Sequence, residues 1–296
     1  MTFRLVEVER AQHPVLRLCS VLGVTRAGFY AWKGRGASRR EREDRELEGM
    51  IHRVFAGSLE TYGAPRVHAE LRKAHGVRVG RKRVARLMRA MGIEGVSRRG
   101  KRRRTTIPDP AAPPAPDLVN RRFQADGPNQ LWVADLTYIP TYEGWLFLSA
   151  VVDMFSRKVV GWSMRNDLKA DLVVDALSMA VVRRRPAPGV IHHSDRGSQY
   201  TSLAFGRTLR ESSVAASMGS RGDAYDNAAC ESFISTIKNE LINRRTWKSR
   251  DQVRLAVFEY IETFYNARRC HSALGYLSPA EFETMSASRK EETAVA

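Results

Sequence analysis

The sequence has few cysteines, no long apolar run and, in its first half, few acidic residues. Only three cysteines occur among 296 residues, Cys19, Cys230 and Cys270, and no two form a Cys-x-x-Cys pair. We therefore expect neither a disulfide framework nor a cysteine-built zinc site. Charged residues interrupt every apolar stretch well before the roughly 18 residues that a membrane span needs. Arg4 and Glu7 also break the apolar pattern of a leader, so we expect a cytoplasmic protein.

Charge is distributed unevenly along the chain, whose formal net charge is +17. Residues 1–125 contain 28 Lys and Arg against 12 Asp and Glu, a net charge of +16, whereas residues 126–296 contain 21 against 20, a net charge of +1. A charge that served solubility alone would not need so uneven a split. The basic front half indicates a polyanion partner, and for a cytoplasmic protein this is nucleic acid rather than a membrane. We therefore expect association with the nucleoid.

The first 104 residues are predicted to form two helical units. Residues 1–38 contain short helices between positions 11 and 32, with Thr25 as a possible N-cap, and are typical of a small helix-turn-helix. Residues 39–104 are predicted to form a basic helix-turn-helix DNA-binding domain. Apolar residues at helical spacing predict its helices over 39–55, 66–73 and 81–91.

The predicted helix over 81–91 combines an apolar face with a basic one. Val84, Leu87 and Met88 repeat at helical spacing and are expected to face inward. This leaves cations for the opposite face, which is typical of a helix that contacts DNA. The alternative is a solvated helix face. The side chains predicted to contact DNA are Arg81, Lys82, Arg83 and Arg86.

A change of pattern marks the second half of the chain. Five prolines fall within residues 107–116, so we predict an extended linker over 105–124. Strands are predicted over 131–139, 145–153, 158–164, 190–193 and 214–217, and helices over 171–182, 203–210, 223–241 and 252–265. Three antiparallel strands followed by alternating helices and strands predict an α/β fold with a mixed sheet. We place a catalytic domain at 125–245 and a last helix with a basic polar tail at 246–296.

Three carboxylates stand on elements that can bring them together. Asp135 lies inside a predicted strand, where aspartate is disfavoured, Asp195 follows a short buried strand, and Glu231 lies within a long helix. If the two strands are neighbours and the helix packs across their edge, the three carboxylates form a cluster. Such a ligand set suits Mg²⁺ or Mn²⁺. Two such ions about 4 Å apart serve phosphoryl transfer on a nucleic-acid backbone.

The spacing of these residues adds a fourth member to the set. Thirty-five residues separate Asp195 from Glu231, and Lys238 follows Glu231 by seven positions, which is two helical turns on the same face. A cation at Lys238 can hold the phosphate of a bound DNA end.

These residues and the sequence around them resemble those of the Asp-Asp-Glu transposases and retroviral integrases. The resemblance is closest to the second-reading-frame (OrfB) product of the insertion-sequence-three family of bacterial transposases, and extends from about residue 14 to residue 282. The segments that carry it are Tyr62-Gly63, Arg66 to Leu71, Arg83 to Met88, Asn129 to Trp132, Asp135 to Ile139, Asp153 to Arg157, Val160 to Trp162, His193 to Tyr200, Tyr225 to Ala228, Glu231 to Phe233, Tyr265-Asn266 and His271 to Tyr276.

The resemblance implies an RNase H-like catalytic core and a helix-turn-helix front region. It implies metal-dependent cleavage and strand transfer at the terminal inverted repeats of a mobile element and into target DNA, with Asp135, Asp195 and Glu231 as metal ligands. It also implies a homo-oligomer on DNA and a first-reading-frame product as fusion or partner, whose leucine zipper this chain lacks because it has no sustained heptad run. Two alternatives are an RNase H-like nuclease without strand transfer, and a catalytically silent DNA-binding remnant or regulator.

Several other residues have two possible roles. We expect Asp153 to be a turn carboxylate rather than a member of the site, and leave His192 and His193 open between packing and phosphate or water contact. Trp132, Trp145 and Trp162 are predicted to lie in the core, and Cys230 to pack rather than react. Arg268, Arg269 and His271 are predicted either to contact DNA, by the resemblance, or to form a solvated basic turn.

Overall fold

The computed structural model describes residues 2–97, 125–195, 197–218 and 228–295, and the side chains of these residues except 228–230 and 290–295. The predicted linker over 105–124, the first residues of the helix predicted over 223–241 and the side chain of Cys230 lie outside the described parts. None of the described helices is both long and apolar enough to cross a membrane.

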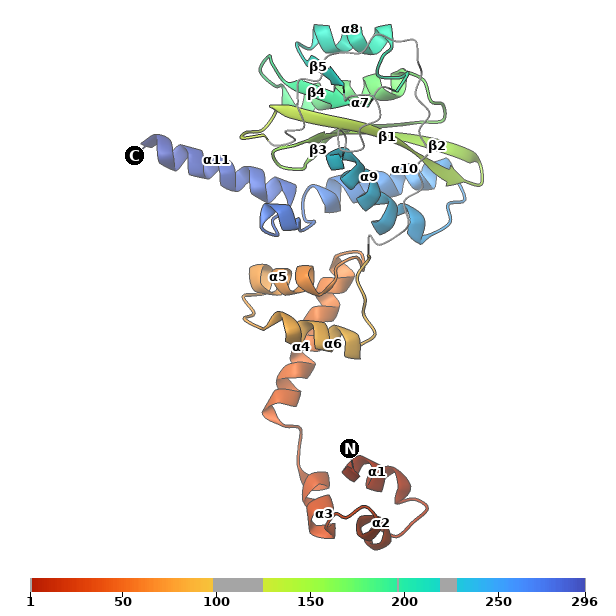
Figure 1. Cartoon of the computed structure of the whole chain (residues 1–296), viewed down its shortest axis with the longest axis vertical. Coiled ribbons are helices and arrows are strands. Elements are labelled where there is room, and N and C mark those ends of the chain that lie inside the picture. Colours follow the sequence, from red (N-terminus) through yellow and green to blue (C-terminus); the bar gives the residue numbers. More distant parts are fainter. Residues whose placement is uncertain (1, 98–124, 196, 219–227, 296) are drawn as a thin grey trace.

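Three short helices form a small unit at the N-terminal end, drawn in dark red in Figure 1. They are α1 (Thr2–Glu9), α2 (Val15–Val21) and α3 (Arg26–Gly34). Val6, Cys19 and Phe29 make its buried core. The Thr25 hydroxyl accepts a hydrogen bond from the Gly28 amide at 3.0 Å, which confirms the predicted cap of α3. Helix α1 was not predicted.

The second unit consists of α4 (Arg39–Gly57), α5 (Ala64–His75) and α6 (Arg81–Ala90). Ser38 and Glu41 form a reciprocal capping box that fixes the start of α4. Helix α5 ends at Gly76, whose backbone is left-handed with φ of 64°, a conformation that glycine adopts without a Cβ penalty. The buried apolar stripes of the three helices agree with the predicted periodicity and include Leu47, Ile51, Val67, Leu71, Val84 and Leu87.

A mixed five-stranded sheet forms the centre of the second half. Its strands are β1 (Leu131–Thr141), β2 (Gly144–Asp153), β3 (Val159–Arg165), β4 (Ile191–Ser194) and β5 (Ala215–Met218), in the spatial order β3-β2-β1-β4-β5. The first three are antiparallel, and β4 and β5 run parallel to β1. This arrangement confirms the predicted mixed sheet and places β1 and β4 side by side.

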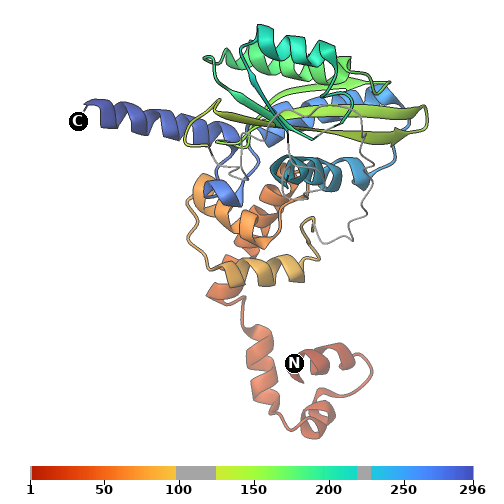
Figure 2. The ribbon, with the colours of Figure 1, turned by 45° about the horizontal axis from the view of Figure 1, so that its top comes forward.

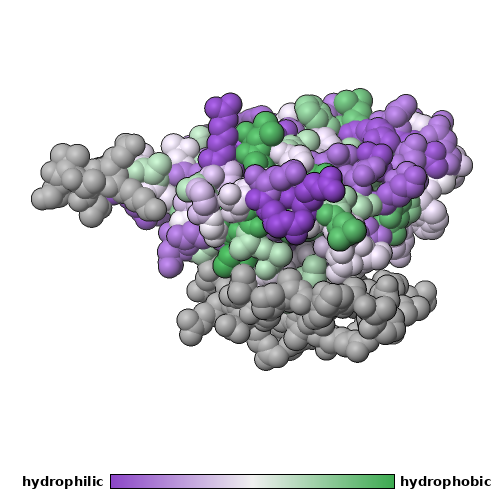
Figure 3. Space-filling view, turned by 90° about the horizontal axis from the view of Figure 1, so that it is seen from above, coloured by the Kyte–Doolittle hydropathy of each residue, from purple (hydrophilic) through white to green (hydrophobic). Residues whose placement is uncertain are grey.

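Helices cover both faces of the sheet (Figure 1). Helices α7 (Asp171–Arg184) and α8 (Leu203–Glu211) lie on one face, where Trp132 and Ala134 of β1 are buried with Leu177. Helices α9 (Ala228–Glu240) and α10 (Arg250–Glu259) lie on the other, where Leu131 and Val133 are buried. Figure 3 looks onto the α8 side and shows hydrophilic side chains interspersed with smaller hydrophobic groups over the described residues of that face.

Three further features differ from the prediction. The helix predicted over 252–265 is α10 followed by a π-helical turn, Tyr260–Tyr265. The predicted polar tail is instead helix α11 (Pro279–Val295), which projects beside the sheet domain in Figures 1 and 2. Trp132 is fully buried and Trp162 is partly buried, but Trp145 is 51% exposed because it lies in the hairpin that joins β1 to β2. The prediction of a core position was therefore wrong for Trp145.

Candidate active site

Asp135 lies in β1 and faces the side of the sheet that α9 covers. Successive strand side chains alternate between faces, so Asp135 shares its face with the buried Leu131 and Val133 rather than with Trp132. Its Oδ1 accepts a hydrogen bond from the Leu136 amide at 2.8 Å. The side chain is partly buried, and its position explains why aspartate occurs in the middle of an otherwise apolar strand.

Asp195 lies next to Asp135 across the sheet. The parallel register pairs Trp132 with His192 and Val133 with His193; continuing it by two residues leads to Asp135 in β1 and to Asp195, which directly follows the last residue of β4. Side chains at matching positions of parallel neighbours point to the same face, and neighbouring strands are about 4.8 Å apart. The Gly197 amide donates a hydrogen bond to Asp195 Oδ1 at 3.1 Å and so orients this carboxylate.

Helix α9 packs against β1 and carries Glu231 and Lys238. The Lys238 ammonium lies 5.2 Å from the ring centroid of Tyr138, which is on β1 three residues beyond Asp135. Lys238 is near enough to Asp135 for the two charges to influence each other. Lys238 therefore lies within electrostatic reach of Asp135, and its contact with a DNA phosphate stays a prediction.

The charges at this site are out of balance. Burial, the Asp195 carboxylate and the Glu231 carboxylate raise the pKa of Asp135 to about 7, against the opposing effect of Lys238. Burial also raises the pKa of Asp195, although the Gly197 hydrogen bond works in the other direction. Burial lowers the pKa of Lys238, partly offset by Asp135. A divalent cation would stabilise the ionised carboxylates, so the donor set and its electrostatics fit a metal of the Mg²⁺ type.

The three acidic residues do not form a closed ligand cage. Within the described parts of the chain, no group of three or more His, Cys, Asp or Glu side chains is arranged to hold a metal ion. Asp135 and Asp195 come together through strand register, and Glu231 contributes to the same electrostatic cluster from α9. The three carboxylates therefore share one electrostatic cluster, and their role as metal ligands stays a prediction.

Comparison with known proteins decides the family. The model of the integrase core domain matches residues 125–224, a second integrase core model matches residues 212–279, and the model of an HTH-like domain matches residues 41–102. The transposase for insertion sequence element IS629 of Shigella sonnei is 41% identical over 285 residues, which cover 94% of each chain. The chain belongs to the IS3 family of insertion-sequence transposases. The expected family, catalytic class and RNase H-like, integrase-type core are thereby confirmed.

A second relative agrees with this membership. Transposase InsF for insertion sequence IS3A of Escherichia coli (strain K12) is 39% identical over 285 residues, 96% of this chain and 98% of that protein. Among solved structures, the HTLV-2 integrase catalytic core domain in complex with magnesium is 16% identical, covers 54% of this chain and 99% of that chain, and has a TM-score of 0.41. Integrase core domains are metal-dependent, and an HTH-like domain is a DNA-binding type of domain.

The cations of helix α6 are of two kinds, those that are paired with acidic residues of α4 and those that are not. Arg81 and Lys82 are exposed and form no ion pair with the described residues. Arg83 Nε lies 2.7 Å from Asp44 Oδ1, and Arg86 Nη2 lies 2.6 Å from Asp44 Oδ2. Both pairs join α6 to α4. DNA contact by all four cations stays a prediction, and Arg81 and Lys82 are the two that the fold leaves available for it.

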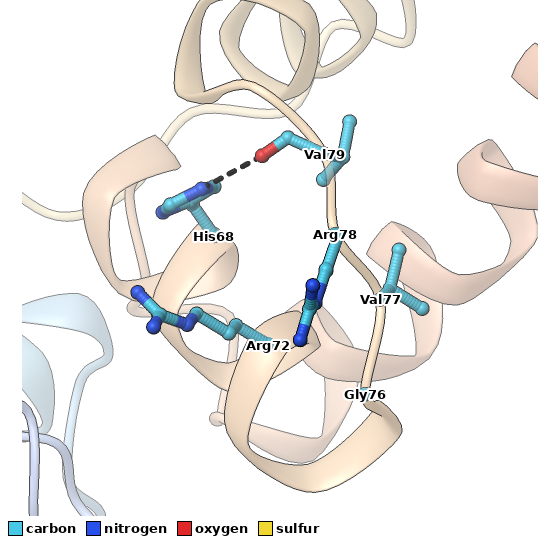
Figure 4. A pocket seen from close by; sticks show the side chains of 6 residues that line it. All are labelled: His68, Arg72, Gly76, Val77, Arg78 and Val79. Carbon is cyan, nitrogen blue, oxygen red and sulfur yellow. Dashed lines mark hydrogen bonds between the residues drawn. The ribbon is translucent and has the colours of Figure 1, made fainter.

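An open hollow between α5 and the segment 76–79 that leads to α6 was not predicted from the sequence (Figure 4). His68 fixes its upper side through a 2.9 Å hydrogen bond between Nε2 and the Val79 carbonyl oxygen. Arg72 and Arg78 also line it. The hollow adds positive charge next to the start of α6, and the only sequence signal for it was the general excess of Arg in the front half.

Asp153 has the structural role that the sequence favoured. It is fully buried at the end of β2, and its two oxygens accept hydrogen bonds from the Asn129 amide at 2.8 Å and the Phe155 amide at 2.9 Å. Arg184 of α7 adds an ion pair at 3.4 Å. These bonds connect the turn after β2 to α7 and to the segment before β1.

His192 and His193 are both packed within the fold. Burial lowers the pKa of His192 to about 4, so the ring is neutral, and it lies edge-on to Phe205 at 5.2 Å between centroids. His193 Nδ1 lies 2.9 Å from Ser217 Oγ on β5. The packing alternative therefore describes both side chains.

Neither alternative for Arg269 was right. Arg269 is 1% exposed, so it is neither a solvated basic turn nor an exposed DNA contact. It forms a bidentate ion pair with Glu240 at the end of α9. Sequence reasoning also missed Glu240 and Tyr138, because neither residue stands in a pattern that indicates chemistry.

Proposed function

We propose that this transposase cleaves DNA strands at the ends of its insertion sequence and joins the freed 3′ ends to target DNA, with Asp135, Asp195 and Glu231 as its metal ligands. The observation that carries the proposal is the juxtaposition of Asp135 in β1 with Asp195, which directly follows the adjacent parallel strand β4, together with a pKa of Asp135 that burial and the neighbouring acidic groups raise to about 7. Burying ionised carboxylates together is costly unless cations offset their charge.

Two Mg²⁺ or Mn²⁺ ions fit the oxygen donors of these three side chains. When bound, they would supply activation of a water or a 3′-hydroxyl and stabilisation of charge on the leaving oxygen. The fold positions each of the three side chains. Asp135 is held by the sheet, Asp195 is oriented by Gly197, and Glu231 approaches on α9.

Cations of the chain hold the DNA. Lys238, beside Asp135, is in position to bind a phosphate next to the reacting strand. Arg81 and Lys82 at the start of α6 are available for the phosphate backbone further along the element end. Contacts of this kind fix register and supply affinity, whereas base readout requires side chains that reach the groove.

The working form includes additional protein. Membership of an insertion-sequence transposase family is the ground for proposing a homo-oligomer on the two element ends and a first-reading-frame product as fusion or partner, as the sequence resemblance implies. The excess positive charge of residues 1–125 supports location on the nucleoid.

A joining assay with a Glu231→Gln variant tests the proposal. Purified chain, a labelled element-end duplex, target DNA and Mg²⁺ or Mn²⁺ are combined, with the first-reading-frame product added in a parallel series. We expect joined product from the wild type and from Glu211→Gln, a matched change on exposed α8, and none from Glu231→Gln despite unchanged DNA binding. Nicks without joining would identify the nuclease alternative, and residual product from Glu231→Gln would overturn the triad.

A further inference from the structure

The C-terminal end of the proposed catalytic helix is fixed by a buried ionic network. Glu240, the last residue of α9, accepts hydrogen bonds from Arg269 Nε at 2.7 Å and from the Tyr260 hydroxyl at 2.8 Å. Glu240 is 5% exposed and Arg269 is 1% exposed. Burial raises the pKa of Glu240, but the bonds and charge of Arg269 outweigh it, so the net pKa is lowered and the carboxylate is ionised.

The helix-turn-helix unit contributes a second cation to the same carboxylate. Arg66 of α5 places Nη1 3.5 Å from Glu240 Oε1. Its guanidinium also lies over the Tyr62 ring, 5.7 Å from the centroid. Glu240 is therefore shared by an arginine of the front unit and an arginine of the catalytic half.

Other contacts hold α5 against the same C-terminal segment. The Tyr62 hydroxyl accepts a hydrogen bond from the Cys270 amide at 2.7 Å, and Cys270 Sγ donates to Glu70 Oε2 at 3.1 Å. Lys73 lies 2.9 Å from Glu281 at the start of α11. Figure 2 shows α5, in orange, next to the blue C-terminal segment. The residues around Arg269 thus form a protein interface rather than a DNA contact.

Helix α9 connects this interface to the chemistry. Glu231 and Glu240 are nine positions apart, about 13.5 Å along one continuous helix. Since a packed helix moves largely as one body, a force on Glu240 is transmitted to Glu231 and Lys238. Arg66 connects the helix-turn-helix unit to α9 most directly, because it contacts Glu240.

We propose that the Arg66–Glu240 contact couples docking of the helix-turn-helix unit to the position of α9, which makes Arg66 a positioning residue for Glu231 and Lys238. The partial exposure of Arg66, 22%, distinguishes it from Arg269, whose loss would leave Glu240 buried without its main partner. The inference rests on the proposed function insofar as Glu231 and Lys238 act in strand transfer. The mechanical part of the inference does not depend on activity.

Hydrogen exchange of the α9 amides in the full chain tests the mechanical part. We expect exchange over residues 233–238 to be about fivefold faster or more in Arg66→Gln than in the wild type. Arg66→Lys, which keeps the charge, and Arg53→Gln, a matched change on exposed α4, should leave exchange unchanged. Equal exchange in Arg66→Gln and Arg53→Gln would overturn the coupling.

Single-turnover joining at saturating element-end DNA tests the consequence. We expect the rate in Arg66→Gln to fall about fivefold or more while the Kd for DNA stays the same, with recovery in Arg66→Lys. A raised Kd with an unchanged rate would show that Arg66 contacts DNA and would overturn the coupling. If the wild type shows no joining while exchange is altered in Arg66→Gln, the proposed function is refuted and the coupling stands. If Arg66→Gln shows normal joining and normal exchange, the coupling is refuted and the proposed function stands.

Discussion

The ammonium of Lys238 lies 5.2 Å from the centre of the Tyr138 ring. This contact connects α9 to β1 three residues beyond Asp135 and holds a partly desolvated cation at the acidic cluster. A cation over an aromatic face gains about 0.5 to 2 kcal/mol, depending on desolvation. If Lys238 binds a DNA phosphate as proposed, we expect Tyr138 to help hold its ammonium in place.

Replacing Tyr138 tests that role. We expect Tyr138→Leu to lower the joining rate at saturating DNA about three- to tenfold, because Lys238 loses a contact worth roughly 1 kcal/mol. Lys238→Gln should lower it further, whereas Tyr142→Leu, a change at an exposed tyrosine in the same hairpin, should have no effect. Equal joining rates in all three variants would show that Lys238 has no part in the reaction.

The raised pKa of Asp135 predicts a pH dependence of stability in metal-free protein. Between about pH 4 and 7 the folded chain retains a proton on this carboxyl that the unfolded chain has lost, so stability falls as pH rises through that window. The full effect is up to about 4 kcal/mol. With EDTA present, we expect Asp135→Asn to be more stable than the wild type at pH 8, and the difference to shrink toward pH 4.

Urea unfolding followed across this pH range provides the measurement. Asp175→Asn, on the exposed face of α7, is the matched control and should track the wild type at each pH. Added Mg²⁺ should stabilise the wild type more than Asp135→Asn. A pH profile shared by all three proteins would contradict the electrostatic account of the cluster.

Close packing of β3 against α7 makes Gly161 intolerant of a side chain. A Cβ at this position would lie 2.1 Å from the Ala176 carbonyl oxygen and 2.7 Å from the Ala180 nitrogen. We expect Gly161→Ala to lower the free energy of unfolding by about 3 kcal/mol or more. In Gly206→Ala on α8 the nearest atom lies 3.7 Å away, so a gain of up to about 1 kcal/mol is expected in urea unfolding.

The exposed cations of α6 predict a salt-dependent contribution to DNA binding. Arg81→Gln and Lys82→Gln should each weaken binding to every sequence and reduce the slope of log K against log salt by about 0.9. Titration of a labelled duplex at several salt concentrations measures this slope. Arg210→Gln on α8 removes the same charge from the catalytic half, and an equal reduction there would mean that α6 is not a specific contact.

Much of the catalytic half could be predicted because its signals are local. The alternating pattern of β1 and the turns after it predicted three antiparallel strands, and an aspartate in the middle of β1 indicated a functional position. The adjacency of the first and fourth strands was only a condition in that reasoning, and the structure shows that it holds. The juxtaposition of Asp135 and Asp195 agrees with that reasoning, since parallel β1 and β4 are neighbours.

The remaining features depend on contacts between distant parts of the chain. Arg269 is buried only because Glu240, 29 positions earlier, neutralises it. Helix α11 lacks a strong apolar period, and its start is held through Glu283 by Arg184 and Lys158, at 2.9 and 3.0 Å. Trp145 is half exposed and packs edge-on against Tyr138 of the neighbouring strand. None of these pairings has a local sequence signature.

The most direct test of the account is joining of a labelled 3′ end to target DNA by the wild type and by Asp135→Asn, each with Mg²⁺ and with the first-reading-frame product present. The account predicts joined product from the wild type and from Asp175→Asn, and at least a thousandfold less from Asp135→Asn at equal DNA occupancy, in line with the large effects of removing central catalytic groups. Joining by Asp135→Asn at a rate near that of the wild type would contradict it.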